Sequence, residues 1–229
     1  MFLNWCVTRK YLNNEDFKNF KSIKQPDGLK VIITTEEMKR IEALKTDKSY
    51  LLNARELFVL SCDTGLRFSD YSRVDRQHLK VDQDGDNVLM IRQKKTSEFI
   101  EIPLTDRAYQ VVCSLISGDI HAISNQKMNA YLKELCELAK IDEPFDSETW
   151  IGKNRTVEVK PKYELVSTHT GRRTFCTKLL EQGVPAQTVM EYSGHKDYKS
   201  FAKYVNIPKQ TQKRSVKEAL MPETKMRVA

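Results

Sequence analysis

The sequence predicts a mainly α-helical fold with a small antiparallel β-sheet, and two observations support this. Apolar residues recur at helical spacing through most of the chain after residue 34, in stretches bounded by capping and turn residues. Residues 87–93 and 99–104 differ, because they form two strand-like runs separated by a short polar turn. A chain of 229 residues can bury a substantial core as one domain, with a fragment of a second.

The composition is that of an ordinary globular protein, with 40% hydrophobic and 30% charged residues. No apolar run approaches the roughly 20 residues that span a bilayer, and no signal-peptide pattern opens the chain. We therefore expect a cytoplasmic protein with no membrane partner. The five scattered cysteines lie in apolar stretches, and we expect them to pack as small hydrophobes without forming disulfides or binding metal.

The positive charge is concentrated in the C-terminal third of the chain. Residues 151–229 contain 16 Lys and Arg against 7 Asp and Glu, a balance of +9, whereas residues 1–150 contain 22 against 24, a balance of −2. This asymmetry predicts a surface for a polyanion, of which nucleic acid is the commonest. A solvated lysine surface is the alternative.

The positions of turn residues divide the chain into three predicted parts. Residues 1–22 are predicted to be helical, and the turn Gln25-Pro26-Asp27-Gly28 marks a domain boundary. The large apolar residues of the opening helix favour residues 1–28 as the remnant and linker of an upstream domain. Residues 29–210 form the main domain. Residues 211–229 form a tail that either packs onto a neighbouring protomer or frays.

Within the main domain, capping residues, proline and glycine set the predicted boundaries. Thr34 and Glu37 have the spacing of a capping box, and Gly65 follows a predicted helix end. Residues 142–165 are predicted to be irregular, with a short strand near 156–159. The remaining expected elements are a strand at 29–33 and helices at 34–44, 50–63, 69–74 (capped by Ser69), 105–117, 124–140, 167–183, 185–193 (with Pro185 at its first position) and 201–205.

Two arginine-containing motifs suit a phosphate ligand. In Thr64-Gly65-Leu66-Arg67 an arginine directly follows a helix-ending glycine. His169 and Arg172 are three residues apart at a helix start, so they share a face near the end of the helix that favours anions. Histidine exchanges protons near neutral pH, and arginine offers a rigid fork of donors. Taken singly, each motif is also compatible with ordinary surface residues.

Two further motifs contain a lysine pair and a tyrosine. Lys94 and Lys95 stand at the tip of the predicted hairpin, where lysines are often simply solvated. The turn Ser193-Gly194-His195-Lys196 is followed, nine residues after the histidine, by Tyr204. A tyrosine between apolar neighbours is commonly a core residue.

Together these motifs occur in the order Arg, Lys, His-x-x-Arg, Gly-His, Tyr. This order resembles the tyrosine recombinase family of phage and conjugative-transposon integrases, and most of all the conjugative-transposon members. The matching segments are TGLRFSD (64–70), QKKTSEFIEIPL (93–104), THTGRRTFCTKLLEQGV (168–184) and SGHKDYKSFAKYV (193–205). The resemblance extends over 29–210 and implies the catalytic-domain fold of that family, with residues 1–28 as the remnant of its upstream core-binding domain and the linker.

The resemblance also implies roles for the reacting groups. Arg67 and Arg172 would bind the non-bridging oxygens of the scissile phosphate. Tyr204 would attack phosphorus to form a 3′-phosphotyrosyl bond. Tyrosine has a reference pKa near 10, so a base or nearby positive charge must assist it. Lys95 would protonate the departing 5′-oxygen.

The same resemblance assigns supporting roles and shows departures. His169 would assist proton transfer at the tyrosine, and His195 would hydrogen-bond the phosphate. Asp70 stands where many relatives have glutamate and is expected to support the site without reacting. Arg173 stands where many relatives have histidine. Lys94 is the alternative to Lys95 as the general acid, although the Lys-Thr before the second strand favours Lys95.

The implied function is cleavage and rejoining of DNA strands in site-specific recombination, with integration and excision of a mobile element. The implied partners are double-stranded DNA, a homotetramer on paired duplexes and accessory DNA-bending proteins. No cofactor or metal is expected, because several cationic groups stabilise the phosphate charge and no HExxH or paired Cys/His motif occurs. The alternatives are a type IB topoisomerase and a catalytically silent DNA-binding module; the complete set of site residues argues against silence.

Overall fold

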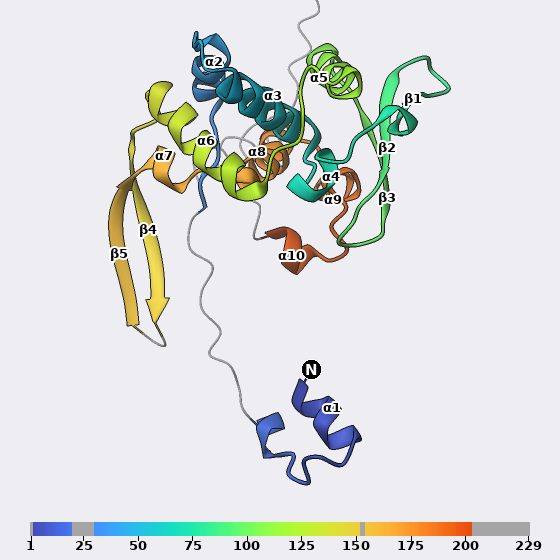
Figure 1. The fold of residues 1–229 in the computed structure, drawn as a ribbon, viewed down its shortest axis with the longest axis vertical. Coiled ribbons are helices and arrows are strands. Elements are labelled where there is room, and N and C mark those ends of the chain that lie inside the picture. The colour runs from blue at the N-terminus through green and yellow to red at the C-terminus, as the bar shows by residue number, and fades with distance from the viewer. Residues whose placement is uncertain (1, 20–29, 152–153, 203–229) are drawn as a thin grey trace, which may run out of the picture.

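The computed structural model describes residues 2–19, 30–151 and 154–202, and confirms the predicted fold class (Figure 1). Its helices are α1 (Phe2–Thr8), η1 (Asp16–Asn19), α2 (Thr35–Ala43), α3 (Ser49–Thr64), α4 (Phe68–Tyr71), η2 (Arg76–His78), α5 (Asp106–Ser117), α6 (Asn125–Leu138), α7 (Lys162–Leu165), α8 (Thr168–Glu181), α9 (Ala186–Ser193) and α10 (Tyr198–Ala202). Its strands are β1 (Leu79–Val81), β2 (Asn87–Arg92), β3 (Phe99–Pro103), β4 (Pro144–Ile151) and β5 (Asn154–Pro161). In this part of the chain no helix is long and apolar enough to cross a membrane.

Helix α3 forms the centre of the domain and packs against α5, α6 and α8 (Figure 1). Most of its apolar side chains are buried in the main core, and Leu51, Leu57 and Phe58 are fully buried. Close approach of α8 depends on Gly171, because a Cβ there would lie 2.6 Å from Ser61 Oγ. This packing sets the C-terminal end of α3 beside α8, where the candidate site lies.

The first sheet has the strand order β1-β2-β3 and is antiparallel throughout. Its register pairs Leu89 with Ile102 and Ile91 with Ile100, and these four side chains are buried. The predicted hairpin is confirmed to within one residue at its strand ends. Strand β1 was not predicted, because it has only three residues and Val81 is 65% exposed, so it has no apolar alternation.

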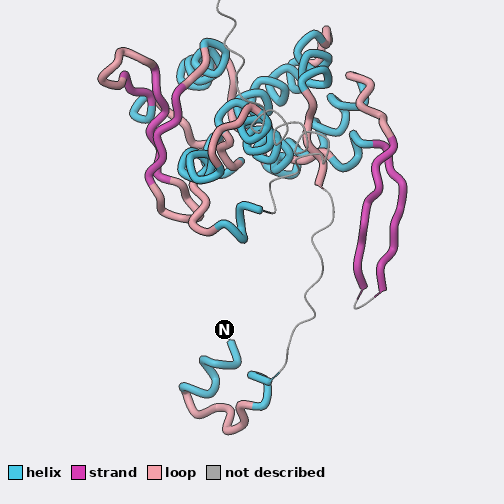
Figure 2. The backbone as a smooth tube through the Cα atoms, turned by 180° about the vertical axis from the view of Figure 1, so that it is seen from behind, coloured by secondary structure: helices cyan, strands magenta, loops and turns pink. Residues whose placement is uncertain are grey.

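The second sheet corrects the prediction that residues 142–165 are irregular. Strands β4 and β5 pair antiparallel from Pro144 opposite Pro161 to Ile151 opposite Asn154. Figures 1 and 2 show this hairpin and the first sheet on opposite sides of the helices. Most of β5 is exposed, and its apolar alternation is limited to Val157 and Val159. That is why the predicted strand at 156–159 was too short.

Several predicted boundaries were also wrong. Residues 30–33 are not a strand: Val31 and Ile33 are buried, but the Ile33 N–H donates to Thr174 Oγ1 on α8, 3.0 Å away. Helix α4 begins after Arg67, not after Ser69, and ends at Tyr71 instead of Val74. Pro185 lies at the N-cap of α9, one residue before its first turn.

At the N-terminal end, the predicted helix over 1–22 is interrupted. The chain forms α1 and η1, separated by residues 9–15, within which Lys10 has a left-handed φ of 60°. Neither helix contains a buried residue. The turn at 25–28, the end of the predicted helix at 201–205 and the tail at 211–229 lie outside the described residues; α10 covers Tyr198–Ala202.

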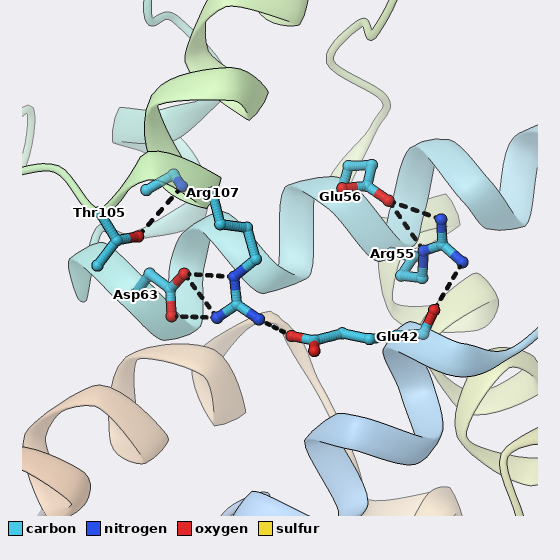
Figure 3. Close-up of polar contacts among 7 residues, drawn as sticks. Glu42, Arg55, Glu56, Asp63, Thr105 and Arg107 are labelled. Carbon is cyan, nitrogen blue, oxygen red and sulfur yellow. Dashed lines mark hydrogen bonds and ion pairs between the residues drawn. The ribbon is translucent and has the colours of Figure 1, made fainter.

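An arginine–carboxylate cluster joins α2, α3 and α5 (Figure 3). The Arg107 guanidinium donates to both oxygens of Asp63, at 2.6 to 2.8 Å, and also contacts the Glu42 carboxylate. Burial raises the pKa of Asp63 to about 6, and the charge of Lys178 opposes that rise. Each charge in this cluster faces an opposite charge, as structural ion pairs require.

Candidate functional site

Arg67 is positioned by the end of α3. Gly65 terminates that helix with φ 65°, and a Cβ there would collide with the Phe175 ring, so both conformation and space require glycine. Two residues later Arg67 occupies the N-cap of α4 and is only 9% exposed. Its guanidinium donates a hydrogen bond to Gln93 Oε1.

Arg172 is fully buried on α8 and joins two other segments of the site. Its Nη1 donates to the Gly65 carbonyl at 2.7 Å. Its Nη2 lies 3.2 and 3.3 Å from the two ring nitrogens of His195. The end of α3, the first half of α8 and the turn after α9 therefore meet at one guanidinium.

His195 follows Gly194, which ends α9 in the left-handed conformation with φ 65°. Its Nδ1 is 2.7 Å from Ser193 Oγ, and that hydroxyl also lies 2.6 Å from the Val189 carbonyl. Because the hydroxyl has one proton for two neighbours, its orientation decides which nitrogen of His195 is protonated. The edge of Phe201, on α10, packs against the imidazole at 5.3 Å between ring centroids.

Burial and nearby positive charge keep His195 neutral. Burial is the larger cause, the charges of Arg172 and Arg67 follow, and together they lower its pKa to about 3 despite the opposing charge of Asp197. The pKa of His169, at the start of α8, is also lowered, first by burial and then by Arg173, Arg172, Arg67 and Lys95. Both imidazoles thus lie in the field of the same arginines.

The loop between β2 and β3 carries Lys94 and Lys95, and both side chains are exposed. The Lys94 N–H donates to Asp70 Oδ1 at 2.8 Å, and Asp70 is fully buried below the loop. The charge of Lys95 is among the causes that lower the pKa of His169, and that of Lys94 is not. The choice of Lys95 over Lys94 as the general acid stays a prediction.

Five of the six predicted residues therefore gather from four separate segments. We call Arg67, Lys95, His169, Arg172 and His195 the cationic cluster. The sixth, Tyr204, lies outside the described residues, two positions beyond Ala202 at the end of α10. Among the described residues no group of His, Cys, Asp or Glu side chains could hold a metal ion.

Gln93 and Ser193 contact the cationic cluster and were not predicted. Gln93 is 1% exposed, and its amide contacts Arg67, Thr96 and the Ser193 carbonyl. The sequence does offer one indication, because Gln93 is a polar residue at the end of an apolar strand. Its partners could not be read from the sequence, since two of them lie 26 and 100 residues away.

Comparison with known proteins identifies the family of this chain. The model of the phage integrase family matches residues 32–211. The search of curated proteins found no match. Three solved structures share the fold at 13% to 17% identity: a lambda integrase dimer bound to a core site (TM-score 0.62, 16% identity), XerA recombinase (0.60, 13%) and the integrase of transposon Tn1549 with circular intermediate DNA (0.58, 17%).

The matches cover a larger share of this chain than of the chains to which it is compared. The match to the lambda integrase covers 89% of this chain and 69% of that chain, and the match to XerA covers 86% and 68%. For the Tn1549 integrase the two shares are 95% and 75%. This chain spans 55% of a XerH recombinase. At such low identities the structural likeness concerns the fold, whereas the family model spans most of the chain. This protein belongs to the phage integrase family, that of the tyrosine recombinases.

Proposed function

We propose that residues 29–210 cleave and rejoin DNA in site-specific recombination, through a 3′-phosphotyrosyl bond to Tyr204. The observation that carries this proposal is the cationic cluster, in which two buried arginines and two neutral histidines from separate segments lie together. Such an excess of fixed donors suits a phosphate whose charge grows in the transition state.

Each residue would act on a particular atom of the scissile phosphodiester. Arg67 and Arg172 would bind the non-bridging oxygens, which gain negative charge as phosphorus becomes five-coordinate. His195 would donate from Nε2 to one of these oxygens, with the Ser193 hydroxyl turned toward Nδ1 to fix that tautomer.

Two proton transfers complete the step. The Tyr204 oxygen forms a bond to phosphorus, and its proton passes to His169, whose lowered pKa keeps it neutral and able to accept. The bond from phosphorus to the 5′-oxygen breaks, and Lys95 protonates that oxygen. Rejoining reverses both transfers on the new strand.

The partner we propose is double-stranded DNA. The lambda and Tn1549 integrase structures are complexes with DNA, and this chain shares their fold. From the family resemblance we further propose a homotetramer on paired duplexes, with DNA-bending proteins, in the integration and excision of a mobile element.

The test is incubation with a nicked suicide DNA duplex, followed by a denaturing gel. The wild-type chain is expected to form a covalent protein–DNA band, with or without EDTA, because protein cations supply the charge stabilisation. Tyr204→Phe is expected to abolish the band and leave DNA affinity within about twofold, since it removes only the nucleophilic oxygen. Tyr198→Phe, an exposed tyrosine of α10, is the matched control and should keep the band.

Three outcomes would contradict parts of the proposal. A band that survives in Tyr204→Phe and disappears in Tyr198→Phe would move the nucleophile. No band from the wild-type chain under conditions where it binds the duplex would favour a silent DNA-binding module. Relaxation of supercoiled plasmid without exchange between two sites would favour a type IB topoisomerase.

A further inference from the structure

Gln93 is a buried amide whose side-chain partners all belong to segments of the candidate site. It follows the last residue of β2 and is 1% exposed. A buried amide costs free energy unless its donors and acceptor are satisfied, so its hydrogen bonds have consequences for its neighbours. Packing alone would be served as well by an apolar side chain at this position.

The amide links Arg67, the β2–β3 loop and the turn that carries His195. Gln93 Oε1 accepts from the Arg67 guanidinium and, at 2.9 Å, from the Thr96 hydroxyl. Gln93 Nε2 donates to the Ser193 carbonyl at 3.0 Å. Room for the amide comes from Gly194, where a Cβ would lie 2.6 Å from Nε2.

The backbone of Gln93 also closes the loop with the two lysines. Its N–H donates to the Glu98 carbonyl at 2.8 Å, and its carbonyl accepts from the Ser97 N–H at 2.9 Å. A salt bridge of 2.6 Å between Glu98 and Lys196 joins the same loop to the residue after His195. A shift of Gln93 would therefore move both Arg67 and the loop.

We propose that Gln93 is a positioning residue of the cleavage reaction, an inference that rests on the proposed function above. It orients the Arg67 guanidinium and holds the loop of Lys95 against the turn of His195. A neutral amide orients an arginine without cancelling its charge, which a carboxylate would do. Glutamate at this position would also set an acceptor against the Ser193 carbonyl.

The decisive variants are Gln93→Met, which keeps length without hydrogen bonds, and Gln93→Glu, which keeps the acceptors. Gln83→Met, at an exposed glutamine in the turn between β1 and β2, is the matched control. Cleavage is measured in a single turnover on nicked DNA with a normal 5′-oxygen or a bridging 5′-sulfur. A thiolate leaves without a proton, so the sulfur substrate bypasses the general acid.

Gln93→Met is expected to lower the cleavage rate about 10–100-fold on the oxygen substrate, with DNA affinity close to wild type and a somewhat lower thermal midpoint, because the partners of the amide are left unsatisfied. On the sulfur substrate the defect should shrink without vanishing, because misplacement of Lys95 is bypassed and misorientation of Arg67 is not. Gln93→Glu should also be slow. If Gln93→Met is unstable, Gln93→Glu decides; wild-type rates in the folded variant would overturn the proposal.

A second measurement separates this proposal from the proposed function. In protein without DNA, trypsin cuts after Lys94 and Lys95 are followed by mass spectrometry. Gln93→Met is expected to be cut several-fold faster than wild type, and Gln83→Met at the wild-type rate. Equal rates in all three proteins would show that Gln93 does not hold the loop. Absence of a covalent band from the wild-type chain would instead reject the proposed function and leave this readout valid.

Discussion

Two polar clusters contact helix α3, and they differ in the charge of the groups that the arginines contact. In the arginine–carboxylate cluster, Arg107 pairs with the carboxylates of Asp63 and Glu42 (Figure 3). In the cationic cluster, Arg67 and Arg172 contact an amide, a backbone carbonyl and an imidazole. The first set of partners cancels charge, and the second orients the guanidiniums while leaving their charge in place.

The difference separates stability from chemistry. A guanidinium that faces carboxylates is already neutralised and can hold helices together. A guanidinium held by neutral acceptors keeps its field, which lowers the pKa of nearby histidines and favours an anion in the site. We therefore infer that the arginine–carboxylate cluster stabilises the fold and that the cationic cluster binds phosphate.

The largest expected effect is the difference in cleavage rate between alanine variants of one arginine from each cluster. Arg67→Ala should slow cleavage about 10²–10³-fold or more, because it removes a preorganised donor. Arg67→Lys should rescue poorly, because a point charge lacks the bidentate geometry. Arg107→Ala should leave cleavage within about threefold and lower the free energy of unfolding by about 1–3 kcal/mol, since Asp63 loses its partner. Single-turnover cleavage and denaturant melts measure both.

Arg172→Ala should differ from Arg67→Ala and Arg107→Ala, because Arg172 is fully buried and donates a hydrogen bond to the Gly65 carbonyl. It is expected to lose activity as Arg67→Ala does and stability as Arg107→Ala does. Full activity in Arg67→Ala, or a large cleavage defect in a folded Arg107→Ala, would show that the two clusters are not separable.

A smaller effect is expected from alanine at two glycines of positive φ. Gly183 (φ 84°) precedes α9 and Gly194 (φ 65°) follows it. A Cβ at Gly194 would collide with Gln93, whereas a Cβ at Gly183 would meet nothing within 4 Å. Both variants should lose about 1–2 kcal/mol of stability through backbone strain. Gly194→Ala alone should also slow cleavage, by about tenfold, because it displaces the amide. Equal cleavage in the two variants would mean that the site tolerates this displacement.

Local chemistry explains what could be predicted from the sequence. The capping box of Thr34 and Glu37 forms as expected, with the Thr34 N–H bonded to Glu37 Oε2 at 2.7 Å. Gly65 ends α3 as its place predicted. The grouping of Arg67, Arg172 and His195 followed from the family resemblance, and their catalytic roles stay predictions.

What could not be predicted depends on distant partners or on exposure. Ser69 has a side chain suited to capping, yet α4 starts at Phe68. The N-cap is Arg67, whose backbone is extended, with ψ 155°. Strand β5 is mostly exposed and alternates only at Val157 and Val159, so residues 154–161 predicted a short strand and not the long hairpin that the structure has. The role of Gln93 arises from contacts across 26 and 100 residues, which no local pattern contains.

The smallest expected effect is a pH dependence of stability that originates in the cationic cluster. The pKa of His195 is lowered to about 3 in the folded chain, from an ordinary value of 6.5. Between these values the unfolded chain binds a proton that the folded chain excludes, so stability should be full above pH 6.5 and decline as the pH falls toward 3. His195→Gln removes this titration, and its thermal midpoint should fall less than that of wild type between pH 7 and pH 5. A control is Lys133→Gln, at an exposed lysine of α6, which leaves His195 in place and should follow the wild-type curve. If His195→Gln and wild type lose stability in parallel, the imidazole is protonated without cost, and the arginines beside it do not exert the field on which the comparison of the two clusters depends.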